Sequence, residues 1–196
     1  DDKTDIIVVD PEREFAEICK LLGGAHIILS ANSRHHINPM RLADAKLLDS
    51  DDKPIPLKIE FLQTVFEQLL GKDEMNSGQR SLIDRGLRQT YKEAKKSEPT
   101  LQDFYRIIKG MSDEGAARLA LGLERFIEGS LDTFAQKSNV DTGNRFTVYD
   151  INELGSGLKD VGMSIMLDGI FSKVAENRSA GRKTIIYVDE FWIMMK

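Results

Sequence analysis

The sequence lacks the features that mark disulfide-rich, membrane-spanning and zinc-binding proteins. It has a single cysteine, Cys19, which excludes an internal disulfide framework and suits a reducing compartment. No run of about 18 apolar residues occurs, so nothing predicts a membrane-spanning helix. His35 and His36 are adjacent, so their side chains diverge, and no Cys or His pair has zinc spacing. The net charge of −5 argues against a chain that binds nucleic acid over its whole surface.

An initiator methionine and a signal peptide are also missing. The first ten residues, DDKTDIIVVD, are acidic and run almost directly into a strand. This indicates a segment of a longer protein, so the missing targeting signal says little about where that protein works. With 196 residues, the chain can still bury a substantial core as one large or two small domains.

Four short runs rich in Ile, Val and Tyr predict β-strands, at residues 6–9, 26–29, 146–151 and 184–188. Most of them lack the alternation of a half-exposed strand. Continuous apolar runs of this kind are typical of strands that are covered on both faces of a parallel sheet.

Helical patterns follow the first and third of these strands. In PEREFAEICKLLGG, Pro11 occupies the expected first turn, and Gly23 and Gly24 mark the end of the helix. Between Gly155 and Gly181, helical spacing predicts one buried stripe, formed by Met163, Met166, Leu167, Ile170, Phe171 and Val174.

The middle of the chain is predicted to be all-helical. One apolar stripe ends at Gly71 and consists of Phe61, Leu62, Val65, Phe66, Leu69 and Leu70. Further helices are expected near 79–96, after Thr100, and near 113–128, with Thr100 and Asp103 forming a capping box. The fold class is therefore α/β, with a parallel sheet core from residues 1–54 and 141–196 and a helical insertion over 55–140.

The helix near 79–96 has a basic face opposite its apolar side. This face consists of Arg85, Arg88, Lys92, Lys95 and Lys96. It could contact DNA or a partner protein, although an ordinary solvated face explains the same pattern.

The most suggestive candidate for chemistry is the end of the last strand, where IIYV is followed by Asp189 and Glu190. Ligands of parallel α/β sheets bind outside the carboxyl ends of the strands. An apolar strand followed by Asp-Glu has the form of a Walker B motif, in which the Asp holds Mg²⁺ and the Glu activates the attacking water. The alternative is that both acids simply begin a solvated loop.

The first strand ends in the same way, with Asp10 and Glu12. If both strands are parallel, these acids reach the same edge of the sheet as Asp189. Glu12 and Glu14 also have a simpler explanation, because acids in the first turn of a helix complement its dipole.

The glycine-rich phosphate loop that a nucleotide site needs is not present. Gly71-Lys72 is followed by Asp73 and ends a helix, and Gly181-Arg182-Lys183-Thr184 leads into a strand. In a nucleotide-hydrolysing protein, this loop would have to precede Asp1.

Taken in order, six short stretches resemble the cytoplasmic ATPase family of conjugative and type IV secretion systems. They are DIIVVDPEREF, INP at 37–39, PTLQDFY, NVD at 139–141, YDINELG and IIYVDEFW. The resemblance spans residues 5–192 and implies an incomplete RecA-like core with an all-helical insertion.

The resemblance also implies how the parent protein works. It would bind ATP and Mg²⁺, with Asp189 linked to the metal, Glu190 as the catalytic base, and Asp10 and Glu12 near the nucleotide pocket. The parent would act as a hexamer with other secretion components, with indirect contact to DNA, at the cytoplasmic face of the bacterial inner membrane. The chain by itself, without the phosphate loop, is expected to bind no cofactor and to be inactive.

Two other functions remain open from the sequence. A related hexameric DNA translocase would share the same core and would carry an additional DNA-reading domain. A non-enzymatic docking module would use the helical insertion to bind a component of the secretion channel.

Overall fold

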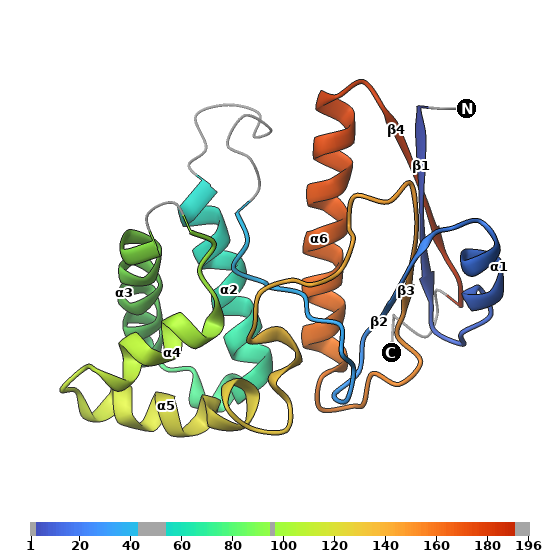
Figure 1. The fold of residues 1–196 in the computed structure, drawn as a ribbon. Helices are drawn as coiled ribbons and strands as arrows, with labels where there is room; N and C mark the ends of the chain where they lie inside the picture. The colour runs from blue at the N-terminus through green and yellow to red at the C-terminus, as the bar shows by residue number, and fades with distance from the viewer. Residues whose placement is uncertain (1–2, 43–53, 95–96, 191–196) are drawn as a thin grey trace. The chain divides into compact units, whose positions relative to one another are not determined.

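The computed structural model describes residues 3–42, 54–94 and 97–190 (Figure 1). The chain divides into two compact units, which we call the sheet unit and the helical unit. The sheet unit comprises Asp1–His35 and Asn139–Lys196, and the helical unit comprises His36–Ser138. None of the described helices has the length and apolar character that crossing a membrane requires.

The sheet unit is built on four parallel strands in the order β2-β3-β1-β4. These are β1 (Thr4–Asp10), β2 (Ala25–Ile28), β3 (Phe146–Asp150) and β4 (Lys183–Val188). Each begins and ends within two residues of a predicted strand. The predicted α/β class and parallel sheet are confirmed.

Helices α1 (Ala16–Leu21) and α6 (Lys159–Ser179) lie on opposite faces of this sheet (Figure 1). Cys19 of α1 packs with Val8 and Val148, which is the apolar filling role that its buried position allows. On the other face, Lys173 and Asn177 of α6 contact the buried carboxylate of Asp5.

Strand β4 corrects the expectation that every strand is covered on both faces. It forms one edge of the sheet, and its side chains Ile185 and Tyr187 are 54% and 48% exposed. Its apolar sequence is therefore not matched by burial within the described residues.

Helix α1 begins later than the sequence predicts. Pro11 was expected in the first helical turn, but the helix begins at Ala16. The buried carboxylate of Asp10 accepts hydrogen bonds from the backbone N–H groups of Glu14 (3.0 Å) and Phe15 (2.9 Å), which ties the intervening residues into a loop. The end of the helix is as predicted, because Gly23 adopts a positive φ of 65° that favours glycine.

The buried stripe of α6 is rotated from its predicted position. Met166 and Ile170 are buried as expected, but Phe171 is 63% exposed. The observed stripe also contains polar residues that face Asp5, which a search for apolar spacing cannot find. It consists of Val161, Gly162, Ile165, Met166, Ile170, Lys173 and Asn177.

The helical unit contains four α-helices and no strand among its described residues. The helices are α2 (Pro54–Leu70), α3 (Ser77–Ala94), α4 (Leu101–Lys109) and α5 (Glu114–Ile127), with short 3₁₀ turns η2 (Lys72–Glu74) and η3 (Asp132–Phe134). Phe66 and Phe104 stack in the core with ring centroids 4.9 Å apart. The predicted capping box of Thr100 and Asp103 is present.

The boundary between the units differs from the predicted one. Residues 1–54 were assigned to the sheet core, whereas the structural division places the described residues 36–42 in the helical unit; residues 43–53 lie outside the described residues. Met40 is fully buried in the helical core, and its carbonyl oxygen accepts a 2.8 Å hydrogen bond from the Tyr91 hydroxyl. Asn38 also donates to the Pro99 carbonyl (2.8 Å). These contacts are distant in sequence, which is why local patterns missed them.

Candidate active site at the acidic sheet edge

Three neighbouring strands of the sheet unit carry acids at their carboxyl ends. Asp10 of β1 lies opposite Asp150 of β3 in the parallel register. Val9 lies opposite Val188, so Asp189 follows β4 at the same edge, where its N–H donates to the Val9 carbonyl (3.1 Å). The structure thus brings Asp10 and Asp189 to one edge. We call this the acidic edge.

The Asp10 carboxylate is hydrogen-bonded to the backbone of the loop that follows β1. It is fully buried, and each of its carboxylate oxygens accepts a hydrogen bond, from Glu14 N–H and from Phe15 N–H. A carboxylate used in this way positions the loop that carries Glu12. Asp10 therefore lies near the candidate site and acts on it through that loop.

Glu190 lies among like charges. Partial burial, followed by the nearby charges of Glu12, Asp189 and Glu14, raises the pKa of its carboxyl group. Carboxylates that repel one another favour either a proton or a bound cation. Glu190 also adopts a φ of 46°, in the left-handed region.

Arg13 is the second non-glycine residue with a positive φ among the described residues, at 62°. It lies at the same edge as Glu190. Such a conformation costs of order 1–2 kcal/mol, and residues held in it tend to cluster at functional sites. Both strained residues of the described chain therefore point to the acidic edge.

Arg13, Asp150 and His26 form a part-buried network that the sequence analysis missed. The Arg13 guanidinium donates to Asp150 and, at 2.9 Å, to Glu153. The hydrogen bond to Asp150 is the main reason that the pKa of Arg13 is raised. The half-buried His26 places Nε2 3.2 Å from the same Asp150 carboxylate. Asp150 fell within the predicted strand over 146–151 and was not singled out. Like Asp10, it follows an apolar run, and that shared pattern was the available signal.

A pocket of about 370 Å³ opens beside this network. Glu12 and Asn152 line it together with Lys159, the first residue of α6. The Asn152 side chain donates to the Pro11 carbonyl (3.0 Å), which joins the loops that follow β1 and β3. Oxygen acceptors and an ammonium group therefore lie side by side at this edge.

The described residues do not complete a metal site by themselves. No group of three or more His, Cys, Asp or Glu side chains within them has the arrangement to hold a metal ion. Mg²⁺ commonly takes one or two carboxylates and fills its remaining positions with water and substrate phosphates. The residues at the acidic edge fit this mode, in which one or two carboxylates hold the ion together with water and phosphates.

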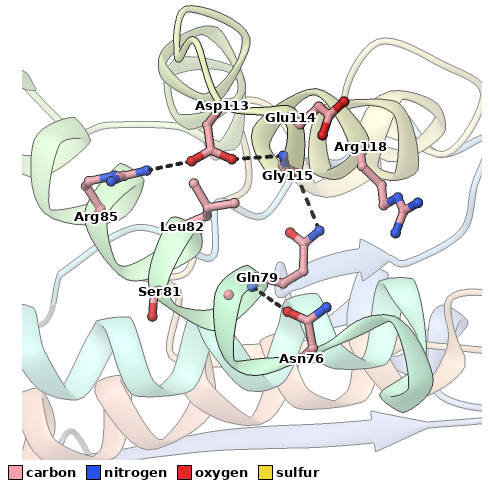
Figure 2. Close-up of a pocket in the computed structure, with 10 residues that line it drawn as sticks. Asn76, Gln79, Ser81, Leu82, Arg85, Asp113, Glu114, Gly115 and Arg118 are labelled. Atoms are coloured by element: carbon pink, nitrogen blue, oxygen red, sulfur yellow. Dashed lines mark hydrogen bonds and ion pairs between the residues drawn. The ribbon is translucent and has the colours of Figure 1, made fainter.

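The predicted basic face lies in the helical unit and is partly neutralised. Arg88 pairs with Asp84 (2.8 Å), and Arg85 approaches Asp113 at 3.8 Å beside a polar pocket between the first turns of α3 and α5 (Figure 2). Lys92 is exposed. Lys95 and Lys96 lie outside the described residues. A DNA or partner role for this face stays a prediction.

Among solved structures, VirB4 of Thermoanaerobacter pseudethanolicus superimposes on the chain with a TM-score of 0.79. The match covers 98% of this chain and 76% of that one, at 24% sequence identity. This chain shares the VirB4 fold. No protein-family model matches the sequence, and no curated protein matches it. Similarity to VirB4 at this level establishes the fold, and the function is a further inference.

Proposed function

We propose that the chain is the central part of the motor domain of a type IV secretion ATPase. The observation that carries this proposal is the match to VirB4, a type IV secretion component, over nearly the whole chain. The ordered motifs of the sequence point to the same family. The acidic edge lies where ligands of parallel α/β sheets bind.

In this proposal the two acids after β4 have separate roles. Asp189 would hold Mg²⁺, directly or through water, and Glu190 would orient the attacking water and accept its proton. The metal supplies charge neutralisation for the phosphates when it is bound. The raised pKa of Glu190 suits a proton acceptor, because a base works best when its pKa is close to the working pH.

The remaining acids and the network would position this pair. Asp10 fixes the loop that carries Glu12, and the contact from Arg13 to Asp150 joins the loops after β1 and β3. Sequence preceding Asp1 would supply the phosphate loop, so the chain by itself would bind ATP weakly. The exposed apolar side chains of β4 are suited to contact with further parts of the motor.

The wider setting follows from the family. The parent would assemble as a hexamer, contact other secretion components and act at the cytoplasmic face of the inner membrane. The two other candidates, a DNA translocase and a docking module, differ from it in what surrounds this core.

The proposal is tested with the protein extended by about sixty residues upstream, a length that accommodates a strand, a phosphate loop and a helix. We expect the extension to contain a glycine-rich Lys-Ser/Thr loop and to confer ATP binding and hydrolysis. Glu190→Gln should keep nucleotide binding and lose turnover by about 10²–10⁴-fold. The matched control is Glu17→Gln, an exposed change on α1, and it should leave turnover unaltered.

Two results would reject the enzymatic reading. An extension without such a loop would favour a docking module. Undiminished turnover in Glu190→Gln would remove Glu190 from the role of base.

A further inference from the structure

A groove in the helical unit contains none of the residues of the acidic edge or of the predicted basic face. It runs between the last turn of α2 and the outer face of α5, with a volume of about 650 Å³. Its apolar wall is formed by Leu69 and Leu70 of α2 and by Leu121 of α5. Leu121 is 72% exposed, although leucine is most often buried in folded proteins.

The outer face of α5 has the spacing of a helix-binding surface. Arg118, Leu121, Gly122 and Arg125 follow one another at i, i+3, i+4 and i+7, and all four are exposed. The buried side of the same helix already packs in the core through Leu119 and Leu123. Gly122 lets the Leu70 side chain of α2 approach α5 closely, since a Cβ at this position would lie 2.9 Å from Leu70 Cδ2, and this contact forms the floor of the groove.

Within the part of the chain that the structure describes, the two arginines of this groove have no acidic partner. Neither Arg118 nor Arg125 forms an ion pair with any described side chain, whereas Arg85 and Arg88 of α3 each do. The Arg125 guanidinium lies over the Phe126 ring, 4.4 Å from its centroid, which favours one position for it. Of the described acidic residues, only Glu74 lines the groove.

We propose that this groove binds an acidic amphipathic helix of a partner protein. Leucine-type side chains of that helix would pack between Leu70 and Leu121, and two carboxylates seven residues apart would pair with Arg118 and Arg125. The geometry agrees with this, since seven residues of a helix span about 10 Å, the same rise that separates the two arginines along α5. The apolar wall between the cations favours a peptide over a nucleic acid, whose phosphates would leave the leucines exposed. This interaction requires no nucleotide.

The test selects binders without assuming a partner. A displayed library of helical peptides of about 16 residues is screened on the 196-residue chain. Each peptide has leucines three and four residues apart and Glu, Lys or Ser at the flanking positions. Selected peptides are expected to carry Glu at two positions seven apart. A fluorescein-labelled example should bind at least about tenfold more tightly than its Glu→Lys counterpart, measured by anisotropy.

Variants assign the binding to the groove. Leu121→Asp should weaken the acidic peptide at least about tenfold, and the double change Arg118→Glu with Arg125→Glu should reverse the preference in favour of the Lys peptide. Lys20→Glu, an exposed basic site on α1 in the sheet unit, is the control and should leave binding unchanged. Circular dichroism checks that each variant keeps its helices.

Other occupants are outcomes that overturn the proposal. Selection without Glu, or binding that ignores Leu121→Asp, would show that the groove does not recognise an acidic helix. A dimer in sedimentation analysis that is lost in Leu121→Asp would assign the groove to a second copy of the chain. Single-stranded DNA that displaces the peptide and requires both arginines would assign it to phosphates.

Discussion

Replacing Asp10 with alanine would remove, in one step, the acceptor for two backbone N–H groups in the loop after β1. These groups belong to Glu14 and Phe15, at 3.0 and 2.9 Å from the two carboxylate oxygens. A hydrogen bond to a charged group contributes about 1.5–3 kcal/mol, so the pair could contribute about 3–6 kcal/mol. Glu14 is exposed and Phe15 is half-buried, so their freed N–H groups would regain water. We therefore expect the free energy of unfolding to fall by about 3 kcal/mol, near the lower end of this range.

The matched variant Asp10→Asn keeps one carbonyl acceptor and the size of the side chain. We expect it to lose about half as much stability, about 1.5 kcal/mol, because one neutral hydrogen bond survives. Amide hydrogen exchange is the suitable assay, since the chain has two units that need not unfold together. Glu14 and Phe15 should lose protection in Asp10→Ala and keep part of it in Asp10→Asn.

This reasoning is refuted if the amides of Glu14 and Phe15 stay protected from hydrogen exchange in Asp10→Ala. The loop would then be fixed by other contacts, and Asp10 would be free to meet a ligand directly.

Three further changes test other parts of the structure. Phe104→Ala should destabilise the helical unit by about 3–5 kcal/mol in urea unfolding, because Phe104 is fully buried against Phe66; a loss below about 1 kcal/mol would contradict that packing. Thr100→Ala should cost about 1 kcal/mol by removing one half of the capping box, and an unchanged midpoint would show that the cap is dispensable. Glu190 has a raised pKa in the folded chain, so its ionisation opposes folding as the pH rises. The free energy of unfolding of Glu190→Gln, relative to that of wild type, should therefore be higher at pH 7 than at pH 4. A variant that differs from wild type by the same amount at both pH values would contradict the charge cluster.

The strands and the acidic edge could be predicted because their signals are local. Apolar runs rich in Ile and Val predicted β1 to β4, and parallel pairing then brought Asp10 and Asp189 to one edge. The helices of the insertion followed from their apolar stripes and from the Thr100–Asp103 cap.

Features that depend on distant contacts were missed. Helix α1 begins late because the buried Asp10 carboxylate accepts hydrogen bonds from the backbone N–H groups of Glu14 and Phe15. Helix propensity does not predict these hydrogen bonds. The Arg13 guanidinium donates a hydrogen bond to Asp150, which lies 137 residues away in the sequence. The observed unit boundary differs from the predicted one because the Tyr91 hydroxyl donates a hydrogen bond to the Met40 carbonyl inside the helical core.

Placement of bound metal by NMR tests the central claim most directly. Mn²⁺ and ATP are added to the upstream-extended protein, and paramagnetic broadening of its amide signals is mapped. The account predicts the strongest broadening at Asp10, Asp150 and Asp189, where the strands end. Broadening centred instead on Thr4, Phe146 and Lys183, where β1, β3 and β4 begin, would contradict it.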